Sequence, residues 1–302
     1  MKTNSTVCVC LASFFFAINL VAAPLDTNKI EQVTGLKGTW NAAEKVFKIS
    51  DPRDDIKVFV DKWNMPPFMG LTSWAAFTEA KAADAMVMGD LVLLQDEVNP
   101  VMSALFDSGL AVTALHNHFF FDEPKVFFMH ISGEGTAEQL AGGLRKVFDK
   151  LKQIRKIHSP SVKNFYGVIA PTNFITASLV ENILGTKGQS KDGMYKVVFG
   201  RSTKMPCGCE VGKEMGVNTW AAFGGLDKMA VVDGDFAVHE DELQAVLKAL
   251  RGASINVVAI HNHMIGETPR TLFVHYWGKG GTENLAKGIK AALDAQKSAT
   301  KK

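Results

Sequence analysis

The feature that most constrains the fold of this chain is an internal repeat. Four short segments occur twice, in the same order and with a spacing that holds within one residue. The paired segments are 71–77 with 217–223, 89–90 with 234–235, 114–118 with 259–263, and 133–136 with 278–282. Four ordered matches predict a duplicated module. Each half, at roughly 130 residues, is long enough to bury a core of its own.

The order of predicted elements within each half indicates the fold class. Hydrophobic alternation and turn residues predict strands, and apolar residues at helical spacing predict helices between and after them. The expected strands are 57–60, 74–77, 87–94, 111–120 and 125–131 in the first half and 229–238 in the second; the expected helices span 98–106 and 243–250 and begin again at Thr136 and Thr282. The pattern predicts an α+β fold: two repeated modules of largely antiparallel sheet with packed helices.

The repeat and the two ends divide the chain into four segments. We expect a secretory signal peptide at 1–23, a first α+β repeat at 27–155, a second α+β repeat at 172–296, and a polar basic tail at 297–302. The signal is predicted from the early Lys2, the apolar run 7–18 and the small residues before position 24. That run is shorter than the roughly 20 residues of a spanning helix, so we expect a periplasmic or secreted protein with no membrane span after signal removal.

Charge and cysteine content narrow the classes of partner and scaffold. The formal net charge is +2, with no basic run beyond Lys301 and Lys302, which gives no electrostatic case for nucleic acid. An unknown small-molecule, cell-wall or protein ligand suits this balance better. After signal removal only Cys207 and Cys209 remain, which excludes a disulfide-stapled scaffold. The pair could form a strained disulfide, bind a soft metal such as copper, or be two inert thiols; a local structural or redox role is weakly favoured.

Six of the eight histidines lie in two equivalent predicted hairpins. They are His116, His118 and His130 in the first half and His261, His263 and His275 in the second. Side chains on a strand alternate with a period of two, so the first two histidines of each hairpin project from the same face. The third follows 14 residues after the first, on the returning strand. The spacing predicts that three rings converge on one face of each hairpin.

Three convergent imidazoles predict a metal site, because histidine is the commonest side-chain ligand of divalent transition metals. Zinc is the first expectation, and bound zinc could activate water for hydrolysis, with Glu123 or Glu267 as general base. Gap-free alignment pairs Glu267 with Asp122, so an acidic group near the turn is repeated but its position is not. Three alternatives stay open: half-buried histidines that bind nothing, a non-catalytic ligand- or partner-binding module, and a pH switch.

Other residues carry weaker signals. Trp74 and Trp220 could line a ligand groove, but a place in the core is favoured. Lys125 and Arg270 follow the turn prolines and could hold an anionic substrate or simply be solvated. The histidine spacing also suits the first metal motif of cupins, but here the third histidine arrives at once and a helix follows. The chain has no nucleophile elbow, P-loop, dinucleotide fingerprint or H-E-x-x-H helix, so whether it is an enzyme stays open.

Several of the repeated motifs also resemble a known family. The segment 70–77 (GLTSWAAF), the strand 89–93 (GDLVL), the hairpin start 114–118 (ALHNH) and the turn 51–53 (DPR) resemble the LppY/LpqO family of exported bacterial proteins. The likeness runs from about Lys29 to Gln296 and implies export and a tandem domain of unknown function. Mycobacterial lipoproteins are among its named members, but this chain lacks a lipid-attachment cysteine, so membrane anchoring is not carried over. The resemblance supplies no catalytic residues.

Overall fold

The structure is a computed structural model that describes residues 25–81, 83–157 and 169–300. The predicted signal peptide, residues 1–23, lies outside the described residues. No helix in these ranges is long and apolar enough to cross a membrane.

The first half folds as the sequence predicts, with additional short elements at its start. Its helices and strands are α1 (Thr27–Thr34), β1 (Gly38–Asn41), β2 (Val46–Pro52), β3 (Val58–Val60), β4 (Trp63–Met65), the 3-10 helix η1 (Pro67–Met69), β5 (Thr72–Glu79), β6 (Ala85–Leu94), α2 (Gln95–Asp107), β7 (Ala111–His116), β8 (Asp122–Glu123), β9 (Val126–Gly135) and α3 (Ala137–Ile157).

The second half repeats this order. Its elements are α4 (Ala177–Leu184), β10 (Gln189–Lys191), β11 (Met194–Gly200), β12 (Thr203–Lys204), β13 (Glu210–Val211), the 3-10 helix η2 (Lys213–Met215), β14 (Asn218–Leu226), β15 (Met229–His239), α5 (Leu243–Gly252), β16 (Asn256–His261), β17 (Thr271–Gly280) and α6 (Thr282–Ala299). Helix α6 therefore extends into the segment interpreted as a tail.

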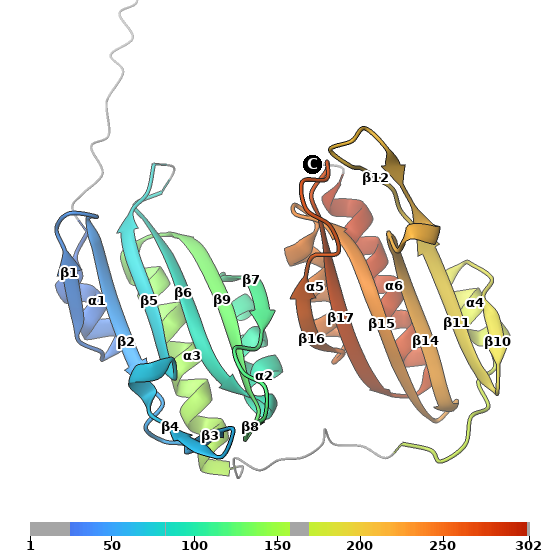
Figure 1. Cartoon of the computed structure of the whole chain (residues 1–302), viewed down its shortest axis with the longest axis horizontal. Helices are drawn as coiled ribbons and strands as arrows, with labels where there is room; N and C mark the ends of the chain where they lie inside the picture. The colour runs from blue at the N-terminus through green and yellow to red at the C-terminus, as the bar shows by residue number, and fades with distance from the viewer. Residues whose placement is uncertain (1–24, 82, 158–168, 301–302) are drawn as a thin grey trace, which may run out of the picture.

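The main strands of both halves form one antiparallel sheet. Its twelve strands run in the order β1-β2-β5-β6-β9-β7-β16-β17-β15-β14-β11-β10. The helices of both halves lie behind this sheet in Figure 1, on one of its faces. The α+β class and the repeated modules with packed helices are thus confirmed.

The core lies between the helices and the sheet because both present apolar faces there. Helix α3 buries Leu144, Val147 and Leu151 at helical spacing, while β6 and β9 turn Leu91 and Met129 towards the helices. These side chains belong to one continuous buried cluster. Alternation along the strands then sends the intervening residues to the opposite face, which we call the open face.

Each half carries a small accessory hairpin, which we call its arm. In the first half the arm is β3 and β4, and β3 also pairs with β8. It covers a second apolar cluster in which Val58 packs with Val92 and Phe128 of the open face. In the second half the arm is β12 and β13, and it is joined to the histidine hairpin by the pairing of Lys204 with Thr268.

The two halves meet at β7 and β16, around an approximate twofold axis. Leu115 pairs with Ile260, which is its equivalent in the repeat. Behind the sheet, the Asn99 side chain bonds to the backbone N–H and C=O of Val257. The equivalent residue Gln244 makes the same two bonds to Val112. Because equivalent residues exchange equivalent contacts, the two arms lie at opposite ends of the molecule (Figure 1).

Candidate metal centre

The three histidines of each hairpin lie on the open face of the joined sheet. In the first half, His116 ends β7, His118 follows in the loop, and His130 lies on β9. His130 pairs with Ala114, two residues before His116, and His116 pairs with Phe128. The sequence placed His130 directly opposite His116; the hairpin register instead makes the two histidines diagonal neighbours.

An aspartate on the next strand faces each set of histidines. Asp90 of β6 pairs with His130, and Asp235 of β15 pairs with His275. Both aspartates are buried, Asp90 at 8% and Asp235 at 2% exposure. The topology therefore adds a carboxylate to each group of three imidazoles.

A glycine precedes each aspartate because the helix-facing side of the strand is filled. A Cβ added to Gly234 would lie 2.1 Å from Tyr276 Oη, a distance that no real side chain tolerates. The Tyr276 hydroxyl occupies that space and donates to the Trp220 carbonyl. The repeated Gly-Asp pair thus has a packing role on one face and a charged side chain on the other.

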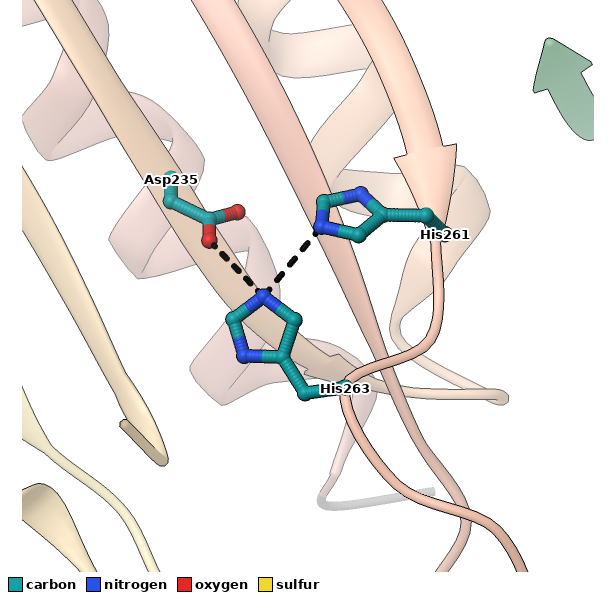
Figure 2. Close-up of side chains that lie close together, drawn as sticks. All are labelled: Asp235, His261 and His263. Carbon is teal, nitrogen blue, oxygen red and sulfur yellow. Dashed lines mark hydrogen bonds and ion pairs between the residues drawn. The ribbon is translucent and has the colours of Figure 1, made fainter. Parts of the chain in front are cut away.

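In the second half, Asp235, His261 and His263 converge (Figure 2). His263 Nε2 lies 3.2 Å from His261 Nε2 and 3.7 Å from Asp235 Oδ2. One ligand atom from each of the three residues lies within 4.8 Å of the other two. The ring of His275 stacks on His261, with centroids 4.8 Å apart. This spacing suits three donors around one cation.

Burial leaves this carboxylate poorly compensated by the protein. Asp235 Oδ1 is buried and has no hydrogen-bond partner among the described residues. Burial raises the pKa of Asp235, and the nearby His275 and His263 oppose that rise. Burial also lowers the pKa of His261, an effect to which His275 and His263 add. A neutral imidazole and an unpaired carboxylate oxygen are the forms that bind a divalent metal.

In the first half, the rings lie as close together as in the second, but the first two histidines are stacked, whereas His261 and His263 are tilted. In both halves the second histidine stacks on a phenylalanine, which is Phe273 in the second half. The ring of His116 lies 5.2 Å from that of His118, with 17° between their planes, and 5.0 Å from that of His130. His118 stacks on Phe128 at 3.4 Å. Burial lowers the pKa of His118, and His116 contributes to the same effect. Asp90 Oδ1, like its counterpart, is buried without a hydrogen-bond partner among the described residues.

The acidic residues expected as general bases lie at the hairpin turns. Glu123 is an exposed residue of β8 and pairs with Phe59 of the arm. Glu267 is buried, and its Oε1 accepts the N–H of Thr271 at 2.9 Å. Its repeat equivalent, Asp122, accepts the N–H of Val126 in the same way. The structure does not bring Glu123 or Glu267 into the group formed by Asp235, His261 and His263.

The two basic residues after the turn prolines also lie away from that group. Lys125 contacts Asp122 at 3.8 Å, and Arg270 contacts Glu240 at 3.3 Å. Both side chains are exposed at the end of the hairpin. The Arg270 contact fits a solvated ion pair, whereas the Asp122 carboxylate that faces Lys125 is buried.

The repeated tryptophans lie on the open face next to the aspartates. Trp74 pairs with Asp90, and Trp220 pairs with Asp235. Both indoles are half-buried, so the predicted place in the core is wrong. Lys48 Nζ lies 4.2 Å above the Trp74 ring, and Lys196 Nζ lies 4.1 Å above that of Trp220. Each pairing is a cation–π contact.

The aspartates are the site residues that sequence reasoning missed. The repeated Gly-Asp pair was visible in the sequence as part of the duplication. Its signal was that a charged residue recurs inside an otherwise apolar strand in both copies, which is costly unless the charge has a partner. Strand order was needed to show that the partners are the histidines.

Comparison with known proteins identifies a family. The family described as a domain of unknown function, DUF1259, matches residues 28–150 and 178–295. No curated protein matches the chain.

Two solved structures match the chain at very low similarity. A trimeric bacterial microcompartment shell protein, PduB, is 9% identical, with 85% of this chain and 89% of that chain covered and a TM-score of 0.20. The double-ringed trimeric shell protein MSM0271 from the RMM microcompartment is 12% identical, with 78% and 85% covered and a TM-score of 0.20.

Proposed function

This chain belongs to the DUF1259 family and carries two tandem copies of its domain, and from the residues the copies share we propose that it binds a divalent transition metal. The ligands would be Asp235, His261 and His263, with His275 beside them, in the second half. The equivalent first-half set is Asp90, His116, His118 and His130. Zinc is the first candidate, because histidine nitrogen atoms and aspartate oxygen atoms are among its usual ligands.

The observation that carries the proposal is the buried, unpaired oxygen of Asp235 beside two imidazole nitrogens. A buried carboxylate oxygen without a hydrogen-bond partner costs free energy unless a cation or proton compensates it. Nitrogen atoms 3.2 Å apart likewise require a shared proton or a shared metal. One divalent cation would satisfy all three groups at once.

The open face determines what bound zinc could do. Three protein ligands leave a coordination position for water, whose pKa zinc lowers towards neutrality. His263 is 37% exposed, so solvent reaches the cluster. Metal-assisted hydrolysis is therefore the enzymatic form of the proposal. In that form Glu123 or Glu267 would have to leave the turn contacts described above to act as general base.

A non-catalytic binding module is the second candidate, and the tryptophans favour it. Trp74 and Trp220 lie half-buried on the same face as the histidines, each beneath a lysine. An indole and an ammonium group beside a metal site could hold a small-molecule, cell-wall or protein ligand. Metal-free protein that is fully folded would favour this function over the first.

We also propose that the protein acts outside the cytoplasm, in the periplasm or as a secreted protein. The sequence of residues 1–23 supports this, as does the resemblance to the LppY/LpqO family. Mass spectrometry of the protein recovered from its host would test it. A chain that begins after residue 23 is expected, and an intact leader on a cytoplasmic chain would contradict the proposal.

The metal proposal is tested by zinc titration and elemental analysis of the untagged chain. All samples carry Cys207→Ser and Cys209→Ser, so that thiolates do not contribute. We expect Asp235→Asn to weaken zinc binding in the second half by at least about 10-fold, since it removes a ligand. The double variant His116→Ala/His261→Ala should lose zinc from both halves.

A histidine outside the two clusters provides the matched control. His239 bonds with Arg201 at the end of β15, and His239→Asn should leave zinc binding unchanged. A chain that takes up no zinc, cobalt or nickel would contradict the proposal. Equal zinc binding by the parent chain and by Asp235→Asn would show that the Asp235 carboxylate is not a zinc ligand.

A further inference from the structure

The arm of the second half ends in a tight turn that carries both cysteines. The Met205 N–H donates to the Cys209 carbonyl at 2.9 Å, and the Gly208 N–H donates to the Met205 carbonyl at 2.8 Å. Gly208 has a φ of +85°, in the left-handed region that favours glycine. These contacts fold Cys207, Gly208 and Cys209 back on themselves.

The turn brings the two thiols into contact at the surface. The Cys209 thiol donates a hydrogen bond to the Cys207 sulfur. Both residues are free and exposed. They are therefore neither core residues nor part of a structural disulfide.

The first half shows that an arm folds without this pair. There the turn between β3 and β4 consists of Asp61 and Lys62. Both halves still join their arm to the histidine hairpin, through Val60 and Asp122 in one and Lys204 and Thr268 in the other. The Cys-Gly-Cys tip is thus an addition to a hairpin that does not need it for folding.

The donor set at this tip selects a soft, monovalent metal. The two thiols and the thioether of Met205, whose backbone N–H bonds to the Cys209 carbonyl, are all sulfur donors. Soft thiolate and thioether ligands select Cu(I), whereas structural zinc sites require four ligands in a tetrahedron. Among the described residues, no histidine or carboxylate groups with these cysteines as a metal-ligand set.

We propose that Cys207 and Cys209 bind one Cu(I) ion, with Met205 as a third donor, at a site separate from the histidine clusters. Binding releases the thiol protons and leaves the copper oxidation state unchanged. The site is held against the histidine hairpin, since Lys204 pairs with Thr268 and Pro206 lies close to Gly266. The second half would then hold two kinds of metal: Cu(I) on sulfur donors, and a divalent metal on the histidine and aspartate donors.

The test is anaerobic competition for Cu(I) against the chromophoric chelator bicinchoninate, with the full chain kept reduced. We expect the wild-type chain to remove one equivalent of Cu(I) from the chelator. Cys207→Ser/Cys209→Ser should lose this uptake, and Met205→Leu should weaken it by about 10-fold. Because the tip is exposed, circular dichroism and melting temperature should stay at wild-type values in these variants.

The histidine clusters supply the control that keeps the two sites distinguishable. His261→Ala/His263→Ala removes the second-half cluster and should leave this copper equivalent in place. Equal Cu(I) uptake by wild type and Cys207→Ser/Cys209→Ser would overturn the proposal. So would a reduced wild-type chain that takes no Cu(I), and neither result would affect the zinc site.

Discussion

The two halves place the same residues at equivalent positions, yet among the described residues only Asp235, His261 and His263 of the second half bring three ligand atoms within 4.8 Å of one another. In the second half the planes of His261 and His263 are tilted by 52°, and Asp235 lies beside them. In the first half the planes of His116 and His118 differ by 17°. Backbone register therefore brings the donors together, and side-chain packing decides how they point.

A neighbouring residue distinguishes the two arrangements. Phe119 packs edge-on against both His118 and Phe128, so His118 lies between aromatic rings. The equivalent residue in the second half is Met264, which is flexible and makes no such ring contact. The comparison indicates that the second-half histidines are the better preorganised ligands.

The halves also differ in the ion pairs of a buried glutamate. This residue is Glu97 at the start of α2 in the first half and Glu242 just before α5 in the second. Glu97 is fully buried and pairs with both Arg53 and Arg155. Its equivalent, Glu242, pairs with Arg201 and also accepts bonds from the neutral side chains of Gln296 and Thr300. In the first half two buried arginines therefore share one fully buried carboxylate, with Asp55 and Asp96 as their further partners.

The largest effect is expected from Glu97→Gln. It removes the fully buried anion that Arg53 and Arg155 share, leaves them only their pairs with Asp55 and Asp96, and should cost about 3–5 kcal/mol of unfolding free energy. Glu242→Gln should cost less, about 1–3 kcal/mol, because Arg201 is 19% exposed and hydrated. Urea unfolding followed by circular dichroism measures both. The exposed pair of Lys29 and Glu138 is the control, with at most about 1 kcal/mol expected for Glu138→Gln.

Acid should weaken the second half through Glu242. Bonds from Arg201, the His239 N–H and Thr300 lower the pKa of Glu242 to about 2, from an ordinary value of 4.5. A lowered carboxyl pKa gives stability that is present above the unfolded pKa and lost as pH falls towards the folded pKa. The loss expected between pH 4.5 and 2 is about 3 kcal/mol.

This acid response is measured as the difference between wild type and Glu242→Gln. Unfolding free energies of both proteins are determined at steps from pH 5 to pH 2. The two curves should approach each other as the pH falls, because the variant has no carboxyl to protonate. Curves that stay parallel would assign the acid response to other groups.

The smallest effect concerns the junction of the halves. Asn99→Ala removes two bonds to Val257 and leaves a buried N–H and C=O unpaired, at a cost of about 1–3 kcal/mol. Gln244→Ala should cost less, because its bonds to Val112 are only part-buried and water can replace them. Thermal unfolding compares the two, with Asn218→Ala at an exposed bond as control. Equal losses would mean that the two sides of the junction are equally buried in solution.

Much of the fold was predictable from local patterns. The strand of residues 87–94, the helix after it and the hairpin that carries His116 and His130 all occur where periodicity and turn residues placed them. Helices α1 and α4 and the edge strands β1 and β10 were not predicted. They are short, and the edge strands are largely exposed, so their sequences show little alternation.

The candidate site was predictable only in part. The six histidines were identified from their spacing, whereas Asp90 and Asp235 emerged from strand order. Glu123 and Glu267 were chosen for their nearness in sequence to the turn, and both remain in contacts at that turn. Nearness along the chain is a poor guide to a carboxylate partner on a sheet, because neighbours there come from adjacent strands.

The sequence by itself determined the duplication, the α+β class and the side of the strand on which His116, His130, His261 and His275 lie. These follow from covalent geometry and local periodicity, since side chains on a strand must alternate. Only the tertiary structure decided that β6 lies beside β9, that Asp235 meets His263, and that β7 and β16 join the halves into one sheet. Such pairings depend on packing between segments far apart in the chain, which no local pattern records.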